Sequence, residues 1–239
     1  MFNFLNIGIG WLLGFIFQAT NHYALSIILL TIVIKFAILP LSLAQLKSSR
    51  GLSQIQPQLQ ELQKKYKNDK ETLNLKTVEL YKEHKVNPLQ GCLPLLIQMP
   101  ILFALFAVLK DPLIYVFSNN QDLANIANSQ VFLWIKDFSQ PDKMSSILNY
   151  KWAESIPGIL PFMAAILTYF QFETMSSTTT SDNEMANSMN KNMKIMFPLM
   201  ILMFGNGMSA GLSLYWVVST SFQMIQQILL KPKSIKEAK

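Results

Sequence analysis

Long apolar segments separated by short polar ones dominate the chain. The apolar segments cover residues 24–46, 89–109, 156–172 and 193–230. A bilayer span needs about 20 mostly apolar residues, because the hydrocarbon core is roughly 30 Å thick and a helix rises about 1.5 Å per residue. The last segment would reach about 57 Å as one helix, so the glycine-rich run at 205–211 predicts a turn between two spans. The pattern predicts an all-α integral membrane protein with five transmembrane helices.

The segment 47–87 is the largest polar region between these spans. We expect a helix to start at Pro57, because a proline at the first helical position loses no hydrogen bond. A polar cluster at 67–70 interrupts the helical pattern, and a second helix follows it up to His84. Two short helices joined by a polar turn predict a helical hairpin. A coiled-coil dimer is the alternative, and it needs more heptads than this segment provides.

The remaining segments flank or connect the spans. Residues 1–23 form a predicted interfacial helix, because 2–17 is apolar but lacks the basic start and cleavage site of a signal peptide. An additional span is the alternative for this helix. Residues 110–155 are a predicted outer connection, with an aromatic patch at 132–135 expected at the membrane interface. Residues 173–192 are a predicted cytoplasmic loop within the region 88–230, and 231–239 form a basic tail.

Composition supports a membrane location, and the distribution of charge predicts the orientation of the chain in the membrane. Hydrophobic residues make up 51% of the chain and charged residues only 14%, against roughly 25% charged in soluble domains. Nine of the 20 basic residues fall between Lys47 and Lys85, and four more lie in the tail. Lys-rich segments of membrane proteins stay in the cytoplasm. The predicted protein therefore lies in a bacterial plasma membrane with its N-terminus outside and its C-terminus cytoplasmic.

Residues for covalent chemistry or metal binding are sparse in the sequence. Cys92 is the single cysteine, and the two histidines, His22 and His84, lie far apart. There is no phosphate-binding glycine loop, no HExxH motif and no paired set of metal ligands. We therefore expect neither an enzyme nor a cofactor or metal site. The net charge of +6 comes without an RNA-binding motif.

The order of the motifs resembles that of the YidC-type membrane protein insertase family, in its short bacterial form without a large extracytoplasmic domain. The resemblance covers nearly all of the chain after residue 20. It is carried by Leu39-Pro40-Leu41, Gln56-Pro57, the runs 87–94 (NPLQGCLP) and 98–100 (QMP), the run 132–142 (FLWIKDFSQPD), 159–161 (ILP), 211–216 (GLSLYW) and Gln226-Gln227. Each piece alone is a weak signal, whereas their joint order and spacing are specific.

The resemblance implies a hydrophilic groove that opens to the cytoplasm and to lipid and is closed toward the outside. A basic residue stands in the family's groove, and Lys35 matches its position, where many relatives carry Arg. Gln171 and Trp216 match other positions that line the groove. Without the resemblance, Gln171 could equally be an interfacial amide and Trp216 an ordinary packing residue.

Lys35 has one further alternative, in which its ammonium group reaches a lipid headgroup. The residue lies eleven positions from either end of 24–46, about 16 Å from each interface, which is beyond the reach of a Lys side chain. A water-lined cavity therefore explains a charge at this depth better than snorkelling does.

The resemblance implies an insertase and chaperone for integral membrane proteins. Its expected partners are nascent membrane proteins and membrane lipids, with the ribosome and a Sec-type translocon as further candidates. A secondary transporter is one alternative, but the span interiors hold no Asp or Glu to couple ions. A purely structural assembly factor is the other, and it would need no charge at Lys35.

Overall fold

The structure is a computed structural model that describes residues 3–84, 93–148, 150–176 and 184–230. Its regular elements within these ranges are helices, joined by turns and three isolated bridges. The helices run in the order α1 (Asn3–Thr20), α2 (Tyr23–Ala37), α3 (Leu39–Lys65), α4 (Lys70–Glu83), α5 (Leu93–Lys110), α6 (Pro112–Tyr115), α7 (Gln121–Ser129), α8 (Ile159–Ser176), α9 (Glu184–Gly205) and α10 (Ala210–Leu229). Two short 3-10 turns, Met144–Ser146 and Lys151–Ser155, precede α8.

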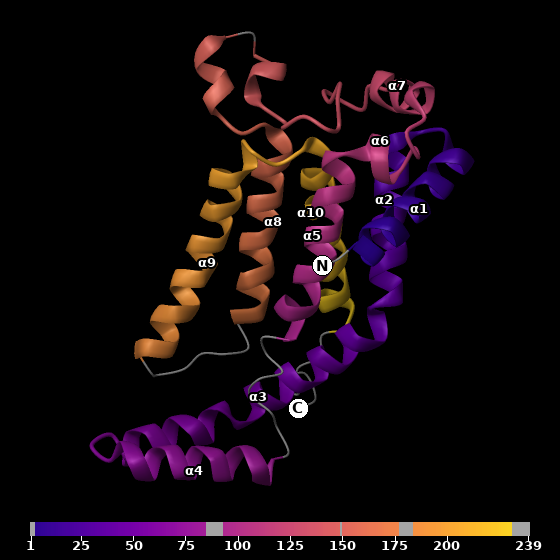
Figure 1. Ribbon diagram of the computed structural model, residues 1–239. Helices are drawn as coiled ribbons and strands as arrows, with labels where there is room; N and C mark the ends of the chain where they lie inside the picture. The colour runs from indigo at the N-terminus through magenta and orange to yellow at the C-terminus, as the bar shows by residue number, and fades with distance from the viewer. Residues whose placement is uncertain (1–2, 85–92, 149, 177–183, 231–239) are drawn as a thin grey trace.

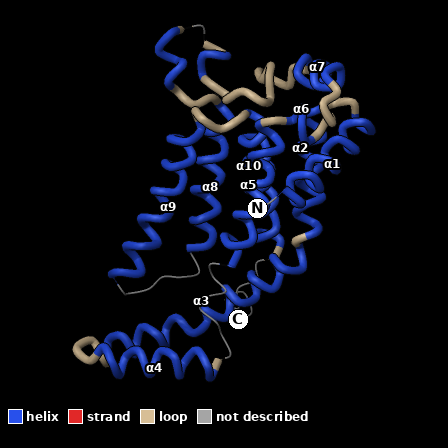
Figure 2. Tube along the Cα trace, in the orientation of Figure 1, coloured by secondary structure: helices blue, strands red, loops and turns tan. Residues whose placement is uncertain are grey.

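Helix α10 occupies the middle of the bundle. It packs against α2, α5 and α8, and α9 lies on the far side of α8 (Figure 1). Most of the α10 side chains from Ala210 to Thr220 are buried, and Tyr215 is among the largest fully buried groups. In Figure 2 the loops gather at one end of the bundle, and the helical hairpin leaves from the other. We call these the loop end and the hairpin end.

The first predicted span is bent rather than straight. A continuous helix was expected over 24–46, but α2 ends at Ala37 and α3 begins at Leu39 with a bend of 55°. Pro40 lies in the first turn of α3 and has no N–H to offer the carbonyl of Phe36. The chain therefore leaves the bundle at an angle, and α3 continues directly into the polar region.

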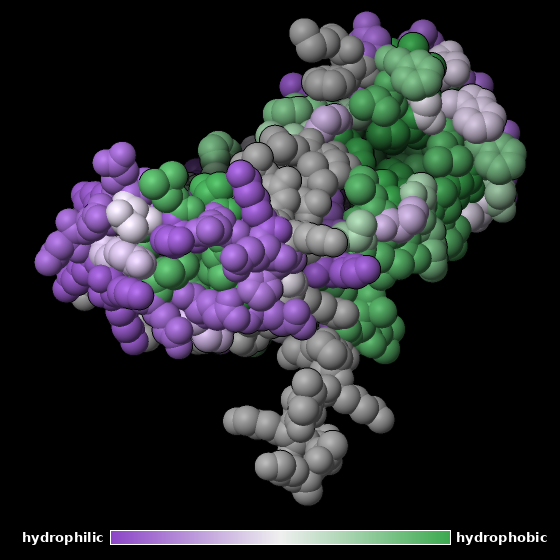
Figure 3. Space-filling model, turned by 90° about the horizontal axis from the view of Figure 1, so that it is seen from below, coloured by the Kyte–Doolittle hydropathy of each residue, from purple (hydrophilic) through white to green (hydrophobic). Residues whose placement is uncertain are grey.

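The hairpin exists, but its first helix starts earlier than the sequence indicated. The expectation that a helix begins at Pro57 is wrong, because Pro57 lies inside α3, which runs unbroken from Leu39 to Lys65. An internal proline costs one backbone hydrogen bond, and the rest of this long helix tolerates the loss. His84 Nε2 lies 2.9 Å from Gln58 Oε1, which links the end of α4 to α3. Seen from below in Figure 3, the hydrophilic hairpin contrasts with the hydrophobic bundle beside it.

The start of α4 has a local cause that can be read from its cap. Asp69 accepts hydrogen bonds from the backbone N–H of Thr72 at 3.0 Å and from the Thr72 hydroxyl at 2.6 Å. These bonds hold the pKa of Asp69 below its usual value. A capping carboxylate at this position satisfies a backbone donor that would otherwise lack a helical partner.

Helix α1 packs obliquely against α2, α5 and α6. Gly14 allows this approach, because a Cβ atom there would lie 2.7 Å from the carbonyl oxygen of Val116. By length and apolarity, α1 is the one described helix that could cross a membrane alone, and α2 with the start of α3 forms a second, bent candidate. The described apolar parts of α5, α8 and α9 are shorter. An interfacial position for α1 stays a prediction.

Two further boundaries differ from the sequence-based expectation. The loop predicted over 173–192 is shorter, because α8 continues to Ser176 and α9 already begins at Glu184. An ion pair between Lys194 and Glu173 joins the two helices. The second span was expected over 89–109, and within the described residues α5 covers it from Leu93 to Lys110 as one helix with Pro100 inside. Cys92 and the basic tail at 231–239 lie outside the described residues.

Candidate functional site

Lys35 lies on the face of α2 that is turned into the bundle. The buried residues of α2 recur at helical spacing, and Lys35 continues the row formed by Ile27, Leu30 and Thr31. Its side chain is 2% exposed, and its Nζ has no hydrogen-bond partner among the described residues. A buried ammonium group without a partner is costly in protein or lipid, because nothing replaces its hydration.

A row of polar residues runs along α10 from the middle of the bundle toward the hairpin end. Tyr215, Ser219, Gln223 and Gln227 are each one turn apart, and we call this row the polar ladder. Three of its four members, Tyr215, Gln223 and Gln227, contact polar groups of neighbouring helices. Gln98 of α5 donates a hydrogen bond to the Tyr215 hydroxyl. Thr174 Oγ1 of α8 lies 2.8 Å from Gln227 Oε1.

The structure places Gln171 and Trp216 on the packed pair α8 and α10. Gln171 Nε2 donates to Gln223 Oε1 at 2.6 Å, so Gln171 joins the polar ladder. Trp216 is partly buried against the hydrophobic core. No described hydrogen bond connects Lys35 to either residue, since its Nζ is unpartnered. Lys35 belongs to α2, whereas Gln171 belongs to α8. Helix α10 packs against both of these helices and so lies between them.

Sequence reasoning missed most of the polar ladder. Gln98, Tyr215 and Gln227 were noted only as parts of motifs. The spacing of four residues from Tyr215 to Gln227 is visible in the sequence and could have revealed one polar helix face. The partners Gln98 and Thr174 could not have been found this way, because they come from other helices.

Buried hydroxyl groups extend the polar character of the bundle interior. Thr168 of α8 and Ser213 of α10 are buried, and their hydroxyl oxygens have no described partner. Buried polar groups in folded proteins generally have a partner, so these hydroxyls and the ammonium of Lys35 are exceptions to that rule. No group of three or more potential metal ligands occurs in the part of the chain that the structure describes.

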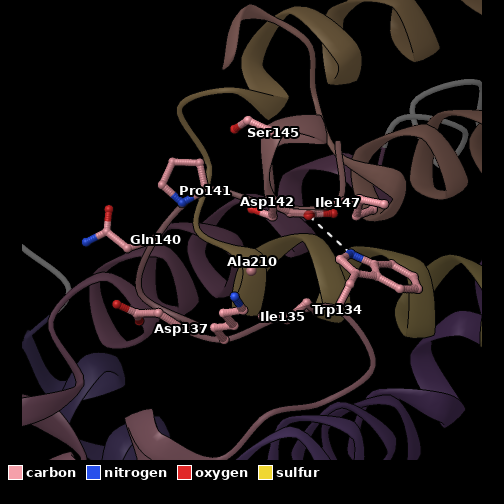
Figure 4. A pocket seen from close by; sticks show the side chains of 11 residues that line it. Trp134, Ile135, Asp137, Gln140, Pro141, Asp142, Ser145, Ile147 and Ala210 are labelled. Carbon is pink, nitrogen blue, oxygen red and sulfur yellow. Dashed lines mark hydrogen bonds between the residues drawn. The ribbon is translucent and has the colours of Figure 1, made fainter. Parts of the chain in front are cut away.

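The loop end of the bundle is tied together by residues 138–143, which we call the strap. Ala210 N donates to Gln140 O at 2.7 Å, and Gly158 N donates to Asp142 O at 2.8 Å. Asp142 is 4% exposed, and its carboxylate accepts from Leu160 N at 2.8 Å and from Trp134 Nε1 at 3.2 Å (Figure 4). Burial raises the pKa of Asp142, and these two hydrogen bonds oppose the rise.

The chain matches known proteins along almost its whole length. The model of the family described as 60Kd inner membrane protein matches residues 15–237. A protein of Fusobacterium nucleatum named membrane protein insertase YidC is 37% identical over 98% of both chains. A protein of Clostridium tetani with the same name is 34% identical, covering 87% of this chain and 81% of the relative.

Longer relatives and a solved structure match in the same way. A membrane protein insertase YidC of Pelodictyon phaeoclathratiforme is 38% identical over 92% of this chain, which spans only 34% of that relative. A crystal structure titled as an active YidC insertase with its first transmembrane domain resolved has a TM-score of 0.63 and 25% identity. It covers 97% of this chain, which corresponds to 47% of that protein. The all-helical fold predicted from the hydrophobic pattern is thereby confirmed, and the chain belongs to the 60Kd inner membrane protein family, the family of the YidC membrane protein insertases.

Proposed function

We propose that this protein inserts other proteins into the membrane through a hydrated groove lined by Lys35 and the polar ladder. The observation that carries this proposal is Lys35, a buried ammonium group without a described partner in a chain of the insertase family. Gln171 and Trp216 line the same groove in this proposal. The hairpin end of the bundle faces the cytoplasm, and the five spans include α2, α5, α8, α9 and α10.

The energetics of insertion explain why such a groove is useful. Burial of apolar area drives an arriving span into lipid, at about 25 cal/mol per Å². The obstacle is the polar flank, since each charge at mid-membrane costs roughly 2.5–3.5 kcal/mol on insertion scales. A groove that is wet over part of the membrane shortens the dry path, and Lys35 attracts acidic flanks. No nucleotide is required for either effect.

The hairpin and its surroundings provide the candidate receiving surface. Helices α3 and α4 project from the bundle and expose Leu75 and Val78 among charged neighbours. We propose that this surface receives nascent membrane proteins or contacts the ribosome or a Sec-type translocon. Within the described residues, the acidic side chains near the spans sit at helix ends, as Glu173 does, which disfavours an ion-coupled transporter.

Reconstitution tests the proposed function directly. Purified protein in lipid vesicles is expected to insert a single-span substrate made by translation in the absence of other membrane proteins, and to do so after nucleotide removal. Empty vesicles and vesicles with heat-unfolded protein are the controls, and protease protection of the substrate is the measurement. Insertion no greater than in empty vesicles would refute the proposal.

The proposed orientation has its own test by cysteine labelling. With Cys92 replaced by Ser, a Cys at Asn68 in the hairpin tip is expected to react with an impermeant maleimide only when the cytoplasmic side is accessible. A Cys at the exposed Asn125 of α7 is expected to react only from outside. Labelling of position 68 in intact cells would contradict the proposed orientation, because it would place the hairpin outside.

A further inference from the structure

The strap joins the loop ends of three helices that surround the proposed groove. Its backbone carbonyls receive the first N–H groups of α10, with Gly211 N donating to Phe138 O at 3.0 Å in addition to the Ala210 bond. Phe138 is 1% exposed and packs edge-on against Tyr23 of α2, with 5.7 Å between the ring centroids. One short segment therefore contacts α2, α8 and α10 at the same level.

Asp142 is the side chain on which the α8 attachment of the strap depends. Its carboxylate bonds both to the first turn of α8 and to Trp134, and its carbonyl receives Gly158 N. Gly158 is required for this approach, because a Cβ atom there would overlap the Asp142 carboxylate. No other carboxylate among the described residues is buried in this way, and nearby Asp137 bonds only locally to Ser139.

The strap lines a hollow at the loop end of the bundle. A cavity of about 480 Å³ opens beside it and is lined by Trp134, Asp137, Gln140, Asp142, Ser145 and Ala210, among others (Figure 4). Ala210 is the first residue of α10. The cavity thus brings the solution at the loop end to the first turn of α10, the helix that carries the polar ladder, and the strap forms part of the cavity wall.

The two ends of the bundle are fastened by different kinds of contact. At the loop end, backbone hydrogen bonds and a buried carboxylate hold α8 and α10 to the strap. Toward the hairpin end, α8 and α10 are joined by side-chain pairs such as Gln171–Gln223 and Thr174–Gln227. Flexible side-chain pairs near water exchange readily with water, whereas bonds to a buried group are costly to break.

We propose that Asp142 is a positioning residue that holds the strap against α8 and so seals the groove at the loop end while the hairpin end admits substrate. This inference rests on the proposed function, because it takes the groove as its starting point. Asp142 acts through the strap and touches no substrate. It makes insertion compatible with a membrane that stays impermeable to small solutes.

Leak of a small dye from vesicles is the measurement that separates sealing from folding. Asp142→Asn keeps the side-chain volume but places an amide N–H against one of the two donors. The removal of a hydrogen bond to a charged group is expected to raise dye release about ten- to a hundredfold. Trp134→Phe removes one bond and leaves that from Leu160, so a smaller rise is expected. Asp137→Asn, a matched change in the same cavity, is expected to leave release at the wild-type rate.

Folding and insertion are measured on the same vesicles to decide between explanations. The neutral Asn is expected to fold, because burial already opposes the charge of Asp142 and raises its pKa. If the Asp142→Asn variant cannot be recovered as folded protein, dye release from vesicles with the Trp134→Phe variant alone tests the sealing role. Wild-type release from the folded variants overturns this inference, even where wild-type protein inserts substrate normally. A wild-type protein that inserts nothing refutes the proposed function instead, whatever the leak.

Discussion

Replacing Lys35 with methionine is expected to lower insertion of substrates with acidic N-terminal flanks by about tenfold and to leave neutral flanks nearly unaffected. A charge at mid-membrane costs roughly 2.5–3.5 kcal/mol, and relief of about half of that by Lys35 changes a rate by roughly tenfold. Lys35→Arg is expected to preserve or raise activity, since the guanidinium group keeps its charge when dehydrated. Lys35→Glu is expected to be worse than Met for acidic flanks, through like-charge repulsion.

Stability distinguishes this electrostatic role from a structural one. Lys35 is buried without a described partner, so an apolar side chain of similar length is expected to keep or raise the melting temperature of the bundle. Lys47→Met, at an exposed position of α3, is the matched control and is expected to behave like wild type. Insertion and melting are measured together in vesicles with flank charge varied. Equal loss for all flanks at unchanged stability would contradict the electrostatic role.

Deleting residues 59–84 is expected to abolish most delivery of ribosome-bound substrates while the bundle remains folded in the membrane. The deleted segment contains the last seven residues of α3 and all of α4, which pack chiefly on each other. Its polar contacts, such as that between His84 and Gln58, lie within the hairpin. The bundle core of α2, α5, α8 and α10 therefore loses little packing.

The comparison of two substrate forms makes this test specific. A short Gly-Ser link replaces the hairpin, and the variant is supplied either with ribosome-bound chains or with released, short substrates. Released substrates are expected to insert at close to the wild-type rate, because Lys35 and the polar ladder are intact. A variant that disappears from the membrane would instead make the hairpin part of the folding core.

Local signals in the sequence predicted the apolar helices and misplaced several of their ends. Hydrophobic runs locate spans well, because the bilayer imposes the same length and apolarity on each of them. Proline was harder to interpret. Pro40 accompanies a bend whose angle no local rule supplies, and Pro57 was taken for a helix start although the helix continues through it. Whether a helix tolerates an internal proline depends on what the rest of it contacts.

The candidate site was only partly accessible to the same reasoning. Lys35 stands out in any sequence as a charge within an apolar run, whereas its burial depends on the packing of α2 against α10. The strap could not have been foreseen at all. Asp142 bonds to Leu160, 18 residues away in sequence, and Gln140 bonds to Ala210, 70 residues away. Contacts between such distant residues produce no periodic pattern in the sequence.

The polar ladder on α10 also bears on how the insertase itself is made. Because of its Ser, Thr and Gln side chains, α10 is not among the helices that are apolar enough to cross a membrane unaided. Such a helix enters lipid at low cost only when Gln98 and Gln171 are already there to receive its polar face. Synthesis from the N-terminus brings α10 out after these partners, because α5 and α8 precede it in the chain. The earlier helices of the same chain are therefore the first protein surface that receives a polar span, and that span is α10 itself.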